Sequence, residues 1–289
     1  MPDTDARPLP PTHHVTTAQG RTIGYCSYGD PDGRLAVVVH GTPGSRYEGL
    51  ALDAPARAAG LHVVVPDRPG YGRTSPAPDN GFHSWDADFV DLLDALGAPG
   101  AALVGFSGGG GYAIAAAQRH PDRVERLVLA CGMIPGAPAE LLARRIPLVT
   151  LLYRVAARAP RVARAMVTGS GIFRFARGSS VSAWPPADQA VMTDPVCKEW
   201  SAADALGAKE QGGDAAVADL RRYARTLPEP LSTLRPPVTF LHGTSDGNVP
   251  VEVARWAHDR IPGSTLRTLP GQGHLFLMAD PSPLVEALG

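Results

Sequence analysis

The chain has 289 residues, of which 44% are hydrophobic and 19% charged, as is typical of a globular protein with a substantial core. Its formal net charge of −1 provides no long-range field that would attract nucleic acid or an anionic membrane surface. The three cysteines, Cys26, Cys131 and Cys197, are far apart and lack paired spacing, which argues against a disulfide framework or a zinc site.

The sequence gives no indication of secretion or membrane insertion. Residues 1–7 lack the basic region and the apolar run of a signal peptide. The chain contains no stretch of about 18 apolar residues, the length that spans a bilayer. We therefore expect a soluble, cytoplasmic protein that acts on a small molecule, without a nucleic-acid or membrane partner. The sequence leaves its oligomeric state open.

Strands and helices alternate along most of the chain, after a proline-rich, polar segment at residues 1–13 that we expect to be a flexible tail. Strands are expected at 21–28, 35–40, 61–66, 101–104, 124–130, 237–242 and 265–269. Helices are expected at 46–60, 84–96, 112–119, 251–261 and 275–288, with Ser84 as the N-cap of the second. Continuous apolar strands separated by helices indicate a parallel sheet covered on both faces.

The alternation stops between residues 133 and 236. This segment has helical stretches interrupted by prolines and no convincing buried strand. About a hundred helical residues inserted between two strands of one sheet predict a cap over its carboxyl edge. Eight arginines lie between residues 140 and 177, and seven acids between 188 and 219. We interpret these charges as solvated faces; the alternative is attraction of an acidic substrate.

The stretch from Gly105 to Gly109, Gly-Phe-Ser-Gly-Gly, lies between an expected buried strand and an expected helix. This is the context of a nucleophile elbow, a tight turn that holds a serine in a strained backbone conformation. Larger residues at the glycine positions would collide with the adjoining strand and helix. We therefore predict that Ser107 stands exposed above the sheet as a nucleophile.

A serine nucleophile needs a positioned base, and a histidine base needs a carboxylate that fixes its tautomer. His274 follows the last expected strand, and Asp246 follows the strand expected at 237–242. These positions converge with Ser107 where the carboxyl ends of parallel strands meet. The residues that follow the strand at 124–130 include no carboxylate, which favours Asp246 as the acid.

A second glycine-containing turn, from His40 to Gly44, follows the strand expected at 35–40. This turn can direct the backbone N–H of Thr42 toward the same point as the N–H of Gly108. Two such donors stabilise the oxyanion of a tetrahedral intermediate. We therefore predict Thr42 and Gly108 as the oxyanion hole.

With these motifs, the chain resembles the α/β-hydrolase superfamily. The resemblance extends from about residue 20 to the end of the chain, apart from the insertion. The matching motifs are His40-Gly-Thr-Pro-Gly44, Asp67-Arg-Pro-Gly-Tyr-Gly72, Gly105-Phe-Ser-Gly-Gly109, Gly243-Thr-Ser-Asp246 and Gly271-Gln-Gly-His274. The resemblance implies an α/β-hydrolase fold, with a mostly parallel central sheet flanked by helices. The hydrolase core would comprise 14–132 and 237–289. A helical cap at 133–236 would follow the strand expected at 124–130, which corresponds to the sixth strand of the α/β-hydrolase fold. The resemblance also implies the triad and oxyanion roles given above.

Two groups within the superfamily are instructive. Proline iminopeptidases look related, but they have a second glycine where Thr42 stands and a tryptophan beside the nucleophile, and this chain has neither. The run Ser107-Gly-Gly-Gly-Gly111 is similar to that of the cofactor-free haloperoxidases, which have the same triad.

The expected activity is hydrolysis of a carboxylic ester, lactone or amide of a small, largely apolar substrate, through an acyl-enzyme on Ser107. No cofactor is needed, and the scattered histidines predict no metal site. The residues expected to line the substrate pocket are His40, Phe106, Met133, Trp184 and Phe276. The alternatives are acyl transfer, cyclisation or perhydrolysis by the same triad, or a non-catalytic, ligand-binding homologue.

Overall fold

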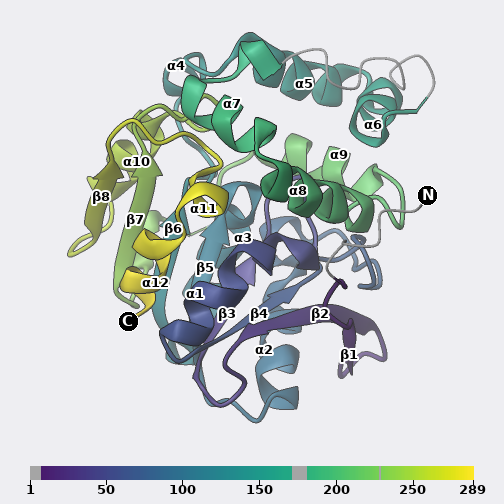
Figure 1. Cartoon of the computed structure of the whole chain (residues 1–289), viewed down its shortest axis with the longest axis vertical. Helices are drawn as coiled ribbons and strands as arrows, with labels where there is room; N and C mark the ends of the chain where they lie inside the picture. Colours follow the sequence, from purple (N-terminus) through teal and green to yellow (C-terminus); the bar gives the residue numbers. More distant parts are fainter. Residues whose placement is uncertain (1–7, 171–180, 228) are drawn as a thin grey trace.

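The computed structural model describes residues 8–170, 181–227 and 229–289, and an eight-stranded sheet forms its centre (Figure 1). The strands are β1 (His13–Thr16), β2 (Thr22–Gly29), β3 (Arg34–Val39), β4 (Leu61–Pro66), β5 (Ala101–Phe106), β6 (Val124–Ala130), β7 (Val238–Gly243) and β8 (Thr265–Leu269). Their order in the sheet is β1-β2-β4-β3-β5-β6-β7-β8. The pairs β1–β2 and β2–β4 are antiparallel and the others are parallel, so the predicted, mostly parallel sheet is confirmed.

Helices cover both faces of this sheet. One face packs against α2 (Asp86–Ala95), α3 (Gly110–Arg119) and α10 (Val251–His258). The other packs against α1 (Asp53–Ala58), α11 (Phe276–Ala279) and α12 (Ser282–Leu288). Successive residues of a strand point to opposite faces. In β4, Val64 accordingly packs on the first face, whereas Val63 and Val65 pack on the second.

The predicted helical insertion follows the sixth strand. Within the described residues its helices are α4 (Ala139–Leu142), α5 (Pro147–Arg158), α6 (Pro160–Thr168), α7 (Pro186–Thr193), α8 (Pro195–Gly207) and α9 (Asp214–Arg222). Figure 1 shows these helices, called the insertion helices below, grouped together beyond one end of the sheet. Four of them begin at a proline, because the first turn needs no backbone N–H from that residue.

Several local expectations differ from the structure. Strand β1 begins at His13, the last residue of the expected tail, and pairs with β2; residues 1–7 lie outside the described residues. Ser84 does not cap α2, because it belongs to a 3-10 turn in which its hydroxyl donates to the carbonyl of Gly81. The helix expected at 46–60 starts as the 3-10 helix η1 (Arg46–Leu52). The last expected helix is divided by Pro281 into α11 and α12.

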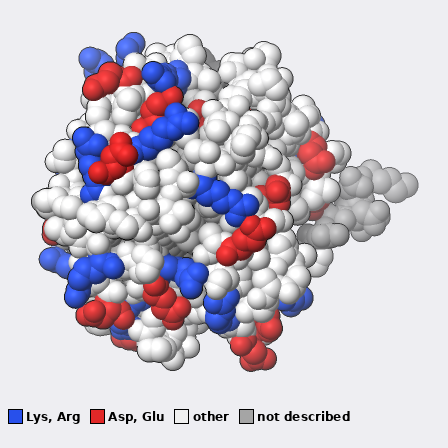
Figure 2. All heavy atoms as spheres, turned by 90° about the vertical axis from the view of Figure 1, so that its left-hand side faces the viewer, with Lys and Arg blue, Asp and Glu red and all other residues white. Residues whose placement is uncertain are grey.

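The lengths of the helices, the surface charges and the cysteines can each be compared with the sequence. No helix in the described ranges is long and apolar enough to cross a membrane. On the face shown in Figure 2, basic and acidic side chains are interspersed and neither sign forms one continuous patch. The three cysteines are buried and unpaired with one another, as their spacing predicts.

Candidate active site

Ser107 lies in a tight turn between the end of β5 and the start of α3. Its backbone has φ +48°, in the left-handed region that is costly for a residue with a side chain. The turn also presses against β3: a Cβ added at Gly109 would lie 2.0 Å from the carbonyl oxygen of Val39. This is the strained strand–turn–helix geometry that the glycine pattern predicts.

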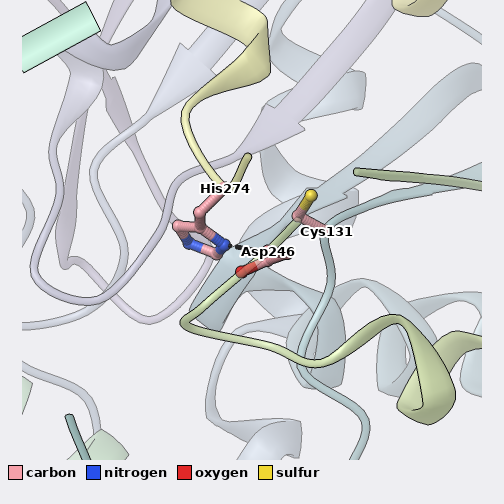
Figure 3. A group of neighbouring side chains, drawn as sticks. All are labelled: Cys131, Asp246 and His274. Atoms are coloured by element: carbon pink, nitrogen blue, oxygen red, sulfur yellow. Dashed lines mark hydrogen bonds and ion pairs between the residues drawn. The ribbon is translucent and has the colours of Figure 1, made fainter. Parts of the chain in front are cut away.

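The structure brings Ser107, His274 and Asp246 together, although they are distant in sequence. His274 Nε2 lies 2.9 Å from Ser107 Oγ. On the other side of the ring, His274 Nδ1 lies 2.8 Å from Asp246 Oδ2, the pair drawn in Figure 3. Asp246 Oδ1 accepts hydrogen bonds from the backbone N–H groups of Asn248 and Val249, both at 2.8 Å. With Nδ1–H donating to Asp246, Nε2 is available to accept the serine proton.

The charges of this group support that arrangement. Burial alone would raise the pKa of Asp246, but the rings of His274 and His242 and their hydrogen bonds hold it well below its usual range. Burial alone would lower the pKa of His274, but the charge of Asp246 and the hydrogen bond to it raise it above the ordinary value. Asp246 is therefore ionised at neutral pH, and it stabilises a protonated His274.

Cys131 lies beside this pair, as Figure 3 shows. Its Sγ, an oxygen of Asp246 and a ring nitrogen of His274 lie within 4.8 Å of one another, a spacing that could also suit a metal ion. Burial, and then the charge of Asp246, raise the pKa of the Cys131 thiol well above its usual value. A neutral thiol is a poor nucleophile and a poor metal ligand. The donor set therefore suits a hydrogen-bonded carboxylate–imidazole pair better than a metal.

Thr42 and Gly108 lie against each other at the end of the sheet. A Cβ added at Gly108 would lie 2.2 Å from Thr42 Oγ1 and 2.9 Å from Thr42 N. A side chain at position 108 would therefore push the two loops apart. The structure thus brings together the two residues that the sequence predicts as oxyanion donors.

His40 is buried and supports the loop that carries Thr42. Its Nδ1 lies 2.8 Å from the carbonyl oxygen of Gly41, and its Nε2 accepts from the backbone N–H of Arg68 at 3.0 Å. Burial and the nearby Arg68 charge lower the pKa of His40 well below its usual value. The ring is therefore neutral, and both of its nitrogens are engaged in holding the loop.

Two cavities meet at Ser107. The larger cavity has a volume of about 340 Å³ and is mostly apolar. It is lined by side chains of the insertion helices and of the loops at the carboxyl end of the sheet, among them Met133, Leu148, Val149, Leu152, Tyr153, Met166, Val167, Trp184, Leu220 and Val249. The smaller, of about 210 Å³, is lined by His274, Phe106, Glu48 and Asp204 among others. Thr42 and Ser107 line both cavities.

The five residues expected at the substrate pocket fall into two groups. Phe106 lines the smaller cavity, and Met133 and Trp184 line the larger one. His40 and Phe276 line neither of the two. Phe276 is only 1% exposed, because α11 turns it toward the hydrophobic core beneath the sheet.

Two acidic side chains give the smaller cavity a polar wall. Glu48 Oε2 accepts from the N–H of Gly41 at 2.9 Å, and Asp204 Oδ1 accepts from the N–H of Ser45 at 2.7 Å. Burial raises the pKa of Asp204 to about 7, and burial together with the Asp204 charge raises the pKa of Glu48 well above its usual value. Both carboxyl groups therefore remain protonated to a higher pH than an exposed carboxyl group does.

Three carboxylates of the insertion helices contact the loops of the site, which sequence reasoning did not anticipate. Asp188 accepts from the N–H groups of His274 at 3.1 Å and Leu275 at 2.8 Å. Asp204 binds the loop after β3, as described above, and Asp219 accepts from Thr42 Oγ1 at 3.0 Å. All three belong to the seven acids expected to face solvent.

Comparisons with known proteins agree with this geometry. Residues 36–287 match the model of the Alpha/beta hydrolase family. A non-heme chloroperoxidase from Streptomyces lividans is 27% identical over 285 residues, which cover 93% of this chain and 95% of that protein. The solved structure of an alpha/beta hydrolase fold protein from Nakamurella multipartita is 28% identical, with a TM-score of 0.64 over 96% of this chain and 97% of that one.

A further solved structure is Est816, described as an N-acyl homoserine lactone degrading enzyme. It is 25% identical, with a TM-score of 0.65 over 96% of this chain and 98% of that one. The family match extends over most of the chain, and the sheet order and the helical insertion agree with it. The chain therefore belongs to the alpha/beta hydrolase family.

Proposed function

We propose that the protein is a serine hydrolase that cleaves a carboxylic ester, lactone or amide with a largely apolar acyl group, through an acyl-enzyme on Ser107. The observation that carries this proposal is the hydrogen-bonded chain from Ser107 through His274 to Asp246, at the mouth of an apolar cavity. The similarity to Est816, an N-acyl homoserine lactone degrading enzyme, supports the same class of reaction.

The reaction follows from the atoms of the site. Ser107 Oγ attacks the carbonyl carbon while His274 Nε2 takes its proton. The N–H groups of Thr42 and Gly108 hold the oxyanion of the tetrahedral intermediate. When the intermediate collapses, the leaving group takes the proton from His274 and departs. Water, activated by the same ring, then attacks the acyl-enzyme and frees Ser107.

The acyl group and the leaving group of the substrate would occupy different cavities. The leaving group must lie within reach of His274 Nε2, and of the two cavities only the smaller is lined by His274. The acyl group would therefore occupy the larger cavity. Its volume of about 340 Å³ and its apolar walls suit an acyl chain or ring of moderate size. The polar wall of the smaller cavity suits a small leaving group.

The test is intact-mass detection of the acyl-enzyme, together with turnover of an activated aryl ester. In Ser107→Ala we expect no adduct and a loss of kcat on the order of 10⁶-fold. Ser232→Ala, which changes an exposed serine in the 3-10 turn Leu231–Thr233, should form the adduct and turn over normally. A folded Ser107→Ala protein that hydrolyses the ester at the wild-type rate would overturn the proposal.

A second candidate is perhydrolysis, which the similarity to the Streptomyces chloroperoxidase favours. Hydrogen peroxide would then replace water as the nucleophile that attacks the acyl-enzyme, and the product would be a peracid. The two reactions share the triad, so they differ only in the second nucleophile. Product analysis with peroxide added at increasing concentration separates them, because a hydrolase yields the carboxylic acid throughout.

A further inference from the structure

Asp219 of α9 extends from the insertion helices to the loop that carries Thr42, one of the two proposed oxyanion donors. Its side chain is 1% exposed. Its Oδ2 accepts from Thr42 Oγ1 at 3.0 Å, from an Arg68 guanidinium N–H at 2.5 Å and from the Tyr71 hydroxyl at 2.7 Å. One carboxylate oxygen thus holds three side chains from the loops that follow β3 and β4.

The other oxygen of this carboxylate is also saturated. Asp219 Oδ1 accepts from the hydroxyl of Tyr112 in α3 and from a guanidinium N–H of Arg222 at 3.0 Å. Burial alone would raise the pKa of Asp219, but the Arg68 charge and these donors lower it. The group is therefore a fully buried carboxylate that is ionised and has five donors in fixed directions.

Arg68 links Asp219 to the backbone of the loop that carries Thr42. The guanidinium that binds Asp219 also donates to the carbonyl oxygen of Gly41 at 2.8 Å and to Thr42 Oγ1 at 2.8 Å. The Gly41 carbonyl and the Thr42 N–H belong to the same planar peptide unit. A hydrogen bond that fixes the carbonyl therefore fixes the direction in which the Thr42 N–H points.

The same face of α9 also contacts the other half of the hole. Tyr223, four residues after Asp219 and the C-cap of α9, donates its hydroxyl to the carbonyl oxygen of Gly108 at 2.9 Å. Its hydroxyl in turn accepts from the N–H of Gly111 at 3.0 Å. The end of α9 is thus hydrogen-bonded to both loops that carry the predicted donors.

We propose that Asp219 is a positioning residue, which holds Arg68 so that the Gly41–Thr42 peptide presents its N–H to the oxyanion. The inference rests on the proposed function, because it assigns a role within that reaction. On this proposal, the loops of the sheet supply both oxyanion donors, and a side chain of the insertion holds one of these loops in position. Asp219 itself does not touch the substrate.

The test is Asp219→Asn, which keeps the size of the side chain and removes its charge. Misplacement of a catalytic group by about 1 Å costs about 10²-fold in rate. We expect kcat for an aryl ester to fall by roughly 10- to 100-fold with KM within about twofold. The affinity for a trifluoromethyl ketone, which forms a tetrahedral adduct on serine, should fall in parallel. The affinity for the corresponding methyl ketone, which remains trigonal, should not.

Arg68→Lys is the second variant, and it guards against a folding defect in Asp219→Asn. Lysine keeps the positive charge beside Asp219 but lacks the planar fork that bridges two acceptors. It should show the same selective loss of kcat and of trifluoromethyl ketone affinity. Asp214→Asn is the matched control: Asp214 is on the same helix, is exposed and pairs with Arg164 at 3.1 Å, away from the oxyanion loop. Its kinetics should be those of the wild type.

Two results would overturn the inference. One is wild-type kcat in a folded Asp219→Asn protein. The other is a fall in kcat without loss of affinity for the trifluoromethyl ketone, which would indicate a role outside the oxyanion hole. Either result, with turnover still abolished in Ser107→Ala, would leave the proposed hydrolase function intact. Loss of the serine mechanism itself would appear instead as activity retained in Ser107→Ala.

Discussion

His274 lies between two carboxylates, with Asp246 at its ring and Asp188 at its backbone N–H. Burial lowers the pKa of His274, but the Asp246 charge, the hydrogen bond to Asp246 and the Asp188 charge together outweigh burial and raise this pKa above the usual value of about 6.5. A protonated ring cannot accept the Ser107 proton, so under the proposed mechanism we expect activity to fall as the pH falls through this pKa. In a pH profile of kcat/KM we expect a midpoint above pH 6.5 and a plateau at higher pH.

Asp246→Asn identifies the origin of that midpoint. The amide removes the negative charge, so kcat should fall on the order of 10⁴-fold and the midpoint should move to lower pH. Asp188→Asn is a matched comparison, because it also removes a carboxylate near His274. Asp188 binds backbone N–H groups and, unlike Asp246, not the imidazole ring. It should move the midpoint in the same direction by a smaller amount. A midpoint that stays in place in Asp246→Asn would exclude His274 as the titrating base.

The residues of the site differ in how far the sequence could identify them. Ser107, Asp246 and His274 were predictable because each follows a strand within a short glycine-containing turn, and parallel strands bring such turns to one edge. Asp188 and Asp219 were not identified, because an acid in a helix usually faces solvent. Their burial depends on which loops the insertion helices contact, and that contact is not encoded in the local pattern.

At the scale of elements, the elbow depends on the close approach of β3 and the turn after β5. A Cβ at Gly109 would meet the backbone of Val39, with 2.0 Å to its oxygen, and a strand in the middle of the sheet cannot move aside. We expect Gly109→Ala to destabilise the fold by about 3 kcal/mol or more, measured by urea unfolding.

Gly97→Ala is the matched control for this substitution. Gly97 has φ +67° and open space around the position of a Cβ, so alanine there meets only the left-handed backbone penalty. That penalty is about 1–2 kcal/mol. Equal stability of the two variants would show that the approach of β3 to the turn is not as tight as described.

The elements themselves were predicted best where their own sequence determines them. β4, β6 and β8 match their expected ranges residue for residue. β4 and β6 lie inside the sheet and carry apolar runs, whereas β8 lies at the edge and is bounded by turn residues on both sides. β1 was not predicted, because it is an edge strand with Val15 as its one buried residue, and it exists through its pairing with β2. The prolines of the insertion were expected to interrupt helices, whereas several of them begin helices.

At the scale of the whole molecule, the larger cavity is assembled from segments that are far apart in the sequence. Its walls come from the loops after β3, β5, β6 and β7 and from α5, α6 and α9. Which face of α5 lines this cavity depends on its packing against α6 and α9, through Ala156, Ala163 and Val217. The helical pattern predicts that α5 has an apolar face, but it does not specify which part of that face packs and which part lines the cavity.

The final prediction tests that assembly through two neighbouring leucines of α5. Leu152 lines the larger cavity, whereas Leu151 is 50% exposed and is not among its lining residues. If the acyl group occupies this cavity, kcat/KM should rise about fourfold for each added methylene until the cavity is full, since each buried methylene contributes about 0.8 kcal/mol.

Leu152→Trp should end that rise at a shorter chain and leave the shortest esters unaffected. Leu151→Trp adds the same ring to the outer face of the helix, so its chain-length profile should be that of the wild type. Wild-type profiles in both variants would show that the acyl group binds elsewhere, and the assignment of the two substrate halves would then have to be reversed.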